Sequence, residues 1–179
     1  PNIEDKTPAK PIDIYGYSKL FSEMLLKKFQ NETGIQSIAL RLFNAVGPRE
    51  TNPHVIPHIF LSAKDTDLIP LGNLEPRRDY IHVDDIASAF LKVTRNRNDV
   101  NAFDIFNVGS GKEYSVVDLI IMIGNILGRE LKVEKKDERV RNVERMHLVS
   151  NISKIKKLIG WKPKLNLEEA LLDTAKYYQ

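Results

Sequence analysis

The chain has 179 residues, of which 42% are hydrophobic and 28% are charged, a balance typical of one folded globular domain. Its net charge of +3 suits an anionic ligand but is far below that of a nucleic-acid-binding tail. Because the sequence contains no cysteine, a disulfide framework, a thiolate zinc site, an iron–sulfur cluster and a cysteine nucleophile are excluded.

No stretch approaches the roughly 18 uncharged apolar residues that a membrane span needs. The nearest one, at 116–127, is too short and is interrupted by Asp118. The first ten residues are polar and proline-rich, unlike a signal peptide. We therefore expect a soluble chain with no membrane partner, and its opening on Pro1 and a loop-like stretch is typical of a fragment.

The first predicted element is a helix that follows Tyr15 and ends at Gly34, where glycine readily takes a left-handed backbone. Its apolar residues recur at helical spacing along one face: Leu20, Phe21, Met24, Leu25 and Phe29. The opposite face carries Glu23, Lys27, Lys28 and Gln30. A short apolar strand at 36–43 comes next. Residues 51–76 contain four prolines and are predicted to form a loop with at most one short helix.

Further strands are predicted at 80–83, 103–108 and 131–136. Asp84 or Asp85 is expected to cap the helix after the first of these strands. Ser115 and Asp118 have the spacing of a capping box, which predicts a helix ending at Gly128. Two short helices complete the chain, one at 153–159 and one after Asn166, where Glu169 again stands at capping-box spacing.

Strands that alternate with helices indicate an α/β fold with a largely parallel sheet. Three or four strands are few for a free-standing doubly wound domain, however.

Tyr15 and Lys19 stand four residues apart, so on a helix they share one face. An ammonium group beside a phenol stabilises the phenolate, which suits a tyrosine to act as a general base. Taken alone the spacing is weak evidence, because a surface tyrosine beside a solvated lysine is the commoner arrangement.

Arginines that could bind phosphate oxygens through paired hydrogen bonds are Arg78 and the group Arg139, Arg141 and Arg145. Exposed basic faces are the alternative interpretation of these residues. The nucleic-acid hypothesis is weak, because the basic residues are dispersed and no recognition module is visible.

His54 and His58 have the spacing of a metal-binding pair, but Pro57 disturbs a helix there and no acid stands between them. We therefore predict no metal site, and we expect His82 to be structural. Gly109-Ser-Gly-Lys112 lacks the other residues of a P-loop. Neither a dinucleotide-binding glycine motif nor a nucleophile elbow is present.

The order of the motifs is more specific than any one of them. In sequence they are Tyr15-Gly-Tyr-Ser-Lys19, Arg41-Leu-Phe-Asn-Ala-Val-Gly-Pro48, Arg78-Asp-Tyr-Ile-His-Val-Asp-Asp85, Asn107-Val-Gly-Ser-Gly111, Ser153-Lys154 and Leu158-Ile-Gly-Trp-Lys-Pro163. In this order the chain resembles the extended short-chain dehydrogenase/reductase family, and more narrowly its NAD-dependent nucleotide-sugar epimerases and dehydratases, with UDP-glucose 4-epimerase as the prototype. Members of that family also carry an N-terminal half with the glycine-rich loop and a catalytic Ser or Thr. The resemblance therefore implies that this chain is the C-terminal half of such an enzyme.

The resemblance implies the C-terminal part of a Rossmann-like parallel sheet domain plus a small mixed α/β substrate-binding domain. Residues 1–50 would end the NAD-binding domain, and residues 51–179 would form mainly the substrate domain, with segments near 79–108 returning to the Rossmann-like sheet. The resemblance also implies a cytoplasmic enzyme. It implies a homodimer as well, because the helix at 17–30 forms half of a four-helix dimer interface in the family. Its apolar face could equally be buried against the sheet.

Residue by residue, Tyr15 is similar to the catalytic base of the family, and Lys19 to the lysine that binds the nicotinamide ribose. Phe43 falls where the backbone touches the nicotinamide end of NAD. Tyr15, Lys19 and Phe43 are thus the implied cofactor-binding residues.

For the nucleotide-sugar substrate, Asn44 matches the asparagine that binds beside the diphosphate. His54 and Val55 occupy the place of the uracil- and ribose-side contacts, and Leu71 that of a side chain packed on the base. Arg78 matches the first diphosphate-binding arginine. Arg141 and Glu144 match an Arg-x-x-Asp motif in which Glu replaces Asp, and Arg139 or Arg145 could serve instead of Arg141. Asn151 replaces the usual Asp before the Ser-Lys pair.

The main interpretation is a UDP-glucose/UDP-galactose-type 4-epimerase that oxidises C4 transiently with NAD. The first alternative is a 4,6-dehydratase of GDP- or dTDP-sugars, since Leu71-Gly-Asn-Leu followed by Arg-Asp is also similar to GDP-mannose dehydratases. The second is a non-catalytic sugar-nucleotide-binding or dimerisation fragment. We expect negligible activity from the chain alone.

Overall fold

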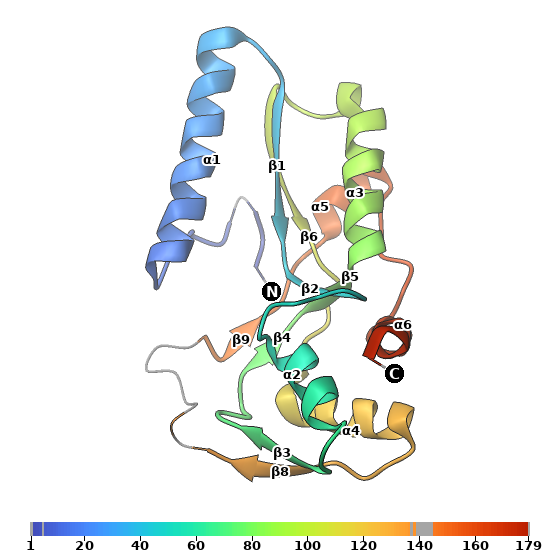
Figure 1. Ribbon diagram of the computed structural model, residues 1–179. Helices are drawn as coiled ribbons and strands as arrows, with labels where there is room; N and C mark the ends of the chain where they lie inside the picture. Colours follow the sequence, from blue (N-terminus) through green and yellow to red (C-terminus); the bar gives the residue numbers. More distant parts are fainter. Residues whose placement is uncertain (1, 5, 137, 139–144, 179) are drawn as a thin grey trace.

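The computed structural model describes residues 2–4, 6–136, 138 and 145–178 (Figure 1). Its helices are α1 (Ile14–Thr33), α2 (Val55–Ser62), α3 (Val83–Arg95), the 3-10 helix η1 (Arg97–Asp99), α4 (Val116–Leu127), α5 (Ser153–Ile159) and α6 (Leu167–Tyr178). Its strands are β1 (Ser37–Leu42), β2 (Asn44–Val46), β3 (Leu68–Leu71), β4 (Arg77–Arg78), β5 (Tyr80–His82), β6 (Phe103–Val108), β7 (Tyr114–Ser115), β8 (Lys132–Lys135) and β9 (His147–Leu148).

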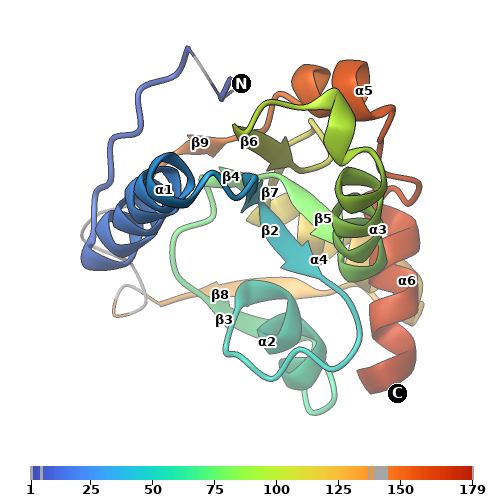
Figure 2. The ribbon, with the colours of Figure 1, turned by 90° about the horizontal axis from the view of Figure 1, so that it is seen from above.

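One part of the molecule is a parallel strand pair between helices. β1 and β6 pair in parallel, from Ser37 opposite Phe103 to Leu42 opposite Val108. α1 lies on one side of this pair, and α3 and α5 lie on the other (Figures 1 and 2). Phe106 and Ile155 belong to the core cluster on the α3–α5 side. Helices on both faces of parallel strands confirm the predicted α/β class.

The other part is a mixed α/β arrangement of short strands and three helices. β2 pairs with β5 and β3 with β8, both in parallel, while β4 lies between antiparallel β7 and parallel β9. The helices α2, α4 and α6 enclose the larger core cluster, which includes Ile59, Ile69, Leu119, Ile123 and Leu171. The division of the chain near residue 50 stays a prediction.

Local capping signals account for several helix ends. The Ser115 hydroxyl accepts a hydrogen bond from the Asp118 amide (3.1 Å), and the Asp118 carboxylate accepts one from the Ser115 amide (2.7 Å). Asn166 and Glu169 form the same reciprocal pair at the start of α6. These bonds satisfy amides that have no partner inside the first helical turn, so both predicted capping boxes are confirmed.

The predicted cap of α3 is wrong. The N-cap is His82, whose Nδ1 accepts a hydrogen bond from the Asp84 amide at 3.2 Å, while Asp84 and Asp85 lie in the first helical turn. His82 is buried, which confirms its predicted structural character.

The segment 51–76 holds more structure than predicted. It contains the expected short helix, α2, but also the strand β3, which pairs with β8. Pro70 lies inside β3 although it has no amide hydrogen to donate. Among the described residues β3 pairs with β8 alone, and this single pairing needs no donor at Pro70. Pro57 does not disturb α2, because it lies in the first turn, where amides lack helical partners in any case.

The predicted apolar face of α1 is not the face turned to the sheet. Phe21, Met24 and Leu25 are about half exposed or more, and no residue of α1 is buried. Glu23, predicted on the polar face, instead forms a two-point ion pair with Arg41 of β1 (2.7 and 2.8 Å). The alternative that the apolar face packs on the sheet is therefore wrong.

Candidate functional site

The first turn of α1 holds the Tyr15–Lys19 pair. The helix starts there because the Asp13 carboxylate accepts a hydrogen bond from the Gly16 amide at 2.7 Å. Lys19 lies one turn after Tyr15, and its Nζ is 5.2 Å from the centroid of the phenol ring. At this distance the ammonium attracts the ring electrons and would stabilise a phenolate. Tyr15 is 70% exposed, so its hydroxyl is open to a ligand.

A cavity of about 660 Å³ lies between α1 and β1 and brings together Tyr15, Lys19 and Phe43. Phe43 directly follows β1, and its amide continues the parallel ladder by donating to the Val108 carbonyl at 3.0 Å. The cavity therefore lies at the carboxyl end of a parallel strand, where α/β proteins bind ligands. Its size is that of a small-molecule site. These residues fit the nicotinamide end of a dinucleotide: a phenol, an ammonium and a main-chain segment line one cavity.

A second tyrosine, Tyr80, differs from Tyr15 in its burial. Tyr80, on β5, is only 6% exposed, and burial raises the pKa of its hydroxyl to about 12. Ionising this side chain near neutral pH is therefore unfavourable, which excludes it as a general base. Tyr15 has the exposure that Tyr80 lacks, and the Lys19 ammonium lies beside it.

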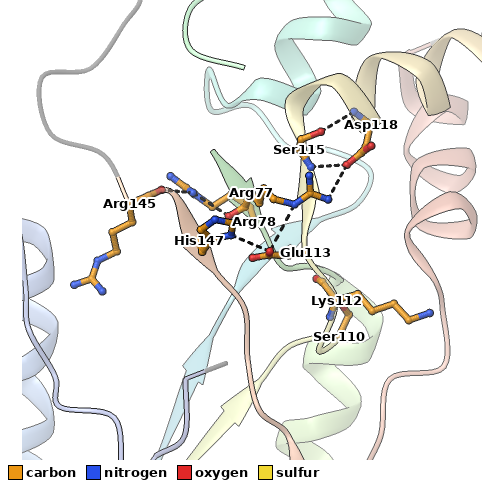
Figure 3. A network of polar contacts seen from close by, with 9 residues as sticks. All are labelled: Arg77, Arg78, Ser110, Lys112, Glu113, Ser115, Asp118, Arg145 and His147. Atoms are coloured by element: carbon orange, nitrogen blue, oxygen red, sulfur yellow. Dashed lines mark hydrogen bonds and ion pairs between the residues drawn. The ribbon is translucent and has the colours of Figure 1, made fainter. Parts of the chain in front are cut away.

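Arg78 lies half-buried on β4, where its guanidinium bridges to a neighbouring segment (Figure 3). Its Nη1 donates to the carbonyls of Arg145 (2.6 Å) and Arg77 (3.0 Å). Arg145 also lines the cavity beside α1, and its guanidinium donates to the Lys10 carbonyl. Arg78 is thus connected through Arg145 to the cavity that holds Tyr15.

Arg77, next to it, belongs to a charged network of a different kind. Its guanidinium lies 3.3 Å from the Asp118 carboxylate and 3.6 Å from that of Glu113, which in turn contacts His147 at 2.9 Å (Figure 3). The network ties β4 to α4 and β9. We conclude that Arg77 serves the packing of this region.

Asp79 is the residue that sequence reasoning missed. Its fully buried carboxylate accepts hydrogen bonds from the amides and hydroxyls of Ser110 and Ser150 and from the Gly111 amide, five bonds of 2.6–3.0 Å. A side chain at Gly109 would put its Cβ 2.4 Å from the Ser150 hydroxyl and 2.7 Å from the Asp79 carboxylate. The amides of Ser110 and Gly111 therefore point at Asp79 and not at a ligand. The Asp after Arg78 and the Gly-Ser-Gly turn were visible in the sequence, but nothing local paired them.

The other predicted substrate residues lie on several elements. Asn44 is the exposed first residue of β2, and its amide donates to the carbonyl of Asp79 at 3.0 Å. Asp79 directly follows Arg78 in the sequence. His54 caps α2 without a side-chain bond to the helix and contacts Glu50, and Val55 is the first residue of that helix. Leu71 is 6% exposed and packs in the larger core cluster. Arg139, Arg141 and Glu144 lie outside the described residues.

The part of the chain that the structure describes contains no group of three or more His, Asp or Glu side chains that could hold a metal ion. Within the same residues, no helix has the length and apolar character needed to cross a membrane.

The fold and the Tyr15–Lys19 cavity define the chain as part of a Rossmann-like α/β protein. The family model for GDP-mannose 4,6 dehydratase matches residues 1–174. The chain belongs to this family of nucleotide-sugar-modifying short-chain dehydrogenase/reductase proteins, as the order of motifs predicted.

Individual relatives agree with this assignment. UDP-glucose 4-epimerase of Streptococcus mutans is 27% identical to this chain, and the match covers 97% of this chain and 56% of the epimerase. The solved UDP-N-acetylglucosamine 4-epimerase of Methanobrevibacter ruminantium is 30% identical, with a TM-score of 0.84 over 98% of this chain and 56% of that one. The UDP-glucose-4-epimerase of Stenotrophomonas maltophila, solved with bound NAD, is 25% identical, with a TM-score of 0.83 over 97% of this chain and 57% of that one. The chain spans slightly more than half the length of these relatives.

Proposed function

We propose that the chain is the C-terminal part of an NAD-dependent nucleotide-sugar 4-epimerase of the UDP-glucose/UDP-galactose type. The observation that carries the proposal is the Tyr15–Lys19 pair in one cavity with Phe43. The names of the related epimerases support the substrate class, and the solved relative with bound NAD supports the cofactor.

In the proposed reaction, Tyr15 acts as the general base at the sugar. As a phenolate it accepts the proton of the C4 hydroxyl, and the ammonium of Lys19, 5.2 Å from its ring, stabilises the negative charge before that transfer. Lys19 also binds the nicotinamide ribose in this proposal, and the main chain at Phe43 supports the ring. Bound NAD would supply the hydride acceptor at C4.

The substrate is held by its diphosphate. Arginine pairs its planar fork of N–H groups with phosphate oxygens, and we assign this role to Arg78, with Arg141 and Glu144 as the second site. Asn44 would bind beside the diphosphate, and His54, Val55 and Leu71 would contact the nucleoside. Arg145 lines the cavity that holds Tyr15, and its carbonyl accepts a hydrogen bond from Arg78. In this proposal Arg145 therefore orients the Arg78 guanidinium.

A second candidate is a 4,6-dehydratase, and the description of the matching family model favours it. The two activities share the oxidation at C4, so Tyr15 and Lys19 keep the same roles in both. They differ in product mass: epimerisation leaves it unchanged, whereas dehydration makes the product lighter by one water. Mass spectrometry of the product formed by the full-length enzyme would therefore separate them.

Calorimetric titration of the chain with UDP-glucose, GDP-mannose and dTDP-glucose tests the substrate proposal. We expect the UDP-sugar to bind and Arg78→Ala to weaken its binding about 10- to 100-fold, the effect of losing a charge-assisted contact. Arg77→Ala is the matched control, because Arg77 lies beside Arg78 but is paired with Glu113 and Asp118. An equal loss of affinity in both variants, or an affinity that Arg78→Ala leaves unchanged, would contradict the proposal.

The proposal also predicts that the 179-residue chain alone has negligible turnover, because it lacks a glycine-rich loop for the dinucleotide pyrophosphate. A coupled assay with UDP-galactose and added NAD measures this. Substantial turnover by the purified chain, abolished in Tyr15→Phe, would show that the chain needs no further segment.

A further inference from the structure

A second cavity lies on the other side of the β1–β6 strand pair from the Tyr15–Lys19 site. It has a volume of about 370 Å³ and is formed by the second half of α3 and the segment that follows α5. Its lining residues are Ser88, Leu91, Lys92, Arg95, Gly160, Trp161, Lys162 and Lys164. None of them lines the cavity beside α1. We call this cavity the α3 groove.

The floor of the α3 groove is held in place by buried polar contacts. The indole Nε1 of Trp161 donates to the Ser88 hydroxyl at 2.9 Å, and Trp161 is 3% exposed. The buried Asp85 carboxylate accepts the amides of Lys164 (2.9 Å) and Leu165 (3.0 Å). Three hydrogen bonds therefore fix the extended segment after α5 onto α3, so the groove exists before any ligand arrives.

The rim of the groove is uniformly positive. Lys92 and Arg95 stand three residues apart on one face of α3, and Lys162 and Lys164 stand two apart on the facing extended segment. All four are exposed, and no acidic side chain lines the groove. Among the residues that the structure describes, none of the four side chains forms an ion pair or a hydrogen bond.

Several cations elsewhere in the chain are paired with acids. Arg41, Arg77, Arg129 and Lys154, for example, each contact a carboxylate. In the α3 groove four like charges instead face one another across a preformed hollow, and a multivalent anion would relieve their repulsion. The hollow has the size of a small-molecule site and is no extended basic track of the kind that binds a nucleic acid.

We propose that the α3 groove binds a small phosphorylated molecule, with its phosphate groups between the Lys92–Arg95 pair and the Lys162–Lys164 pair. A phosphate monoester carries about 1.5–2 negative charges at neutral pH, and Arg95 can bind its oxygens through two hydrogen bonds. The apolar body of the ligand would lie against Leu91 and the edge of Trp161. The site is independent of the function proposed for Tyr15 and Arg78.

Trp161 is the one tryptophan of the sequence, so it reports on this groove alone. We would titrate the chain with sodium pyrophosphate and follow both tryptophan fluorescence and the indole N–H resonance of the ¹⁵N-labelled protein. The expected result is a saturable change that sodium chloride at equal ionic strength does not reproduce. No saturable change, or an equal one with the chloride salt, would overturn the proposal.

Variants locate the response. Lys162→Ala combined with Lys164→Ala should weaken the pyrophosphate response about tenfold, since two exposed ion pairs are lost. The matched control, Lys156→Ala with Lys157→Ala, removes two exposed cations of α5 that do not line the groove and should bind as the parent chain does. Equal weakening in the control pair would assign the effect to general surface charge and reject the site, and citrate binding as tightly as pyrophosphate would reject phosphate as its ligand.

Discussion

At the scale of single residues, Asp79 organises the region around Arg78. It joins β4, the Gly109–Gly111 turn and Ser150 through five hydrogen bonds to one buried carboxylate. Buried charges of this kind stabilise a structure only when every acceptor position is filled, and here the donors are amides and hydroxyls with no net charge. Asp79 therefore determines how the backbone on either side of Arg78 is held.

Replacing Asp79 with Asn should destabilise the chain by about 2–4 kcal/mol, because the neutral amide accepts fewer hydrogen bonds and adds a donor among donors. Urea unfolding followed by circular dichroism measures the change in the free energy of unfolding. Asp65→Asn is the control, since Asp65 is exposed, and it should stay within about 0.5 kcal/mol of the parent. A similar small effect at both positions would mean that Asp79 contributes little.

Residue-level prediction from the sequence succeeded where the signal was local and failed where it was not. The spacing of Tyr15 and Lys19 places both side chains on one face of any helix that contains them, and the structure brings them together with Phe43 in one cavity. The partners of Asp79 lie 31 and more residues away in the sequence, so no periodicity or spacing could indicate them. The roles of the substrate residues stay predictions.

At the scale of elements, the capping box of α4 makes a pH-dependent contribution to stability. The hydrogen bond from the Ser115 amide, more than any other contact, holds the pKa of Asp118 below its ordinary value of 3.8, and Arg77 acts in the same direction. A lowered carboxyl pKa stabilises the folded chain above the unfolded pKa, and this stabilisation is lost as the pH falls through the folded pKa.

Asp118→Asn should therefore lower the free energy of unfolding by about 0.5–1 kcal/mol at pH 7, the size of a lost capping contact. The gap between variant and parent should be constant from pH 7 down to about pH 5 and should close below pH 3.8, where Asp118 itself becomes protonated. Urea unfolding along a pH series measures the gap. A gap that persists unchanged at the lowest pH would assign the effect to packing and not to charge.

The elements that sequence reasoning misjudged are those whose state is decided by tertiary contacts. β3 contains Pro70, which argues against a strand, yet pairing with β8 on one edge needs no donor at that position. His82 caps α3 because burial fixes its ring beside the helix, whereas capping statistics favour aspartate. Helical periodicity identified α1, but only its contact with β1, through Glu23 and Arg41, determines which face is turned inward.

At the scale of the whole molecule, the 20-residue helix α1 packs mainly against β1. It has no buried residue, and its exposed apolar side chains include Tyr17, Phe21, Met24 and Leu25. A row of large apolar residues on one exposed helix is typical of a surface that is covered in an assembly. We therefore propose the homodimer that the family resemblance implies, with α1 pairing against α1 of a second copy.

Sedimentation velocity over a range of concentrations tests this pairing. We expect the chain to form dimers reversibly, and Phe21→Glu combined with Met24→Glu to make it monomeric, because each change places a charge in the apolar contact. Ile121→Glu is the control: this residue is equally exposed, at 56%, but lies on α4. A monomeric parent chain, or dimers that persist in the α1 variant, would contradict the assignment. Larger, polydisperse species in the parent would indicate association through the edge of β1 that has no partner strand among the described residues, since open strand edges favour uncontrolled pairing.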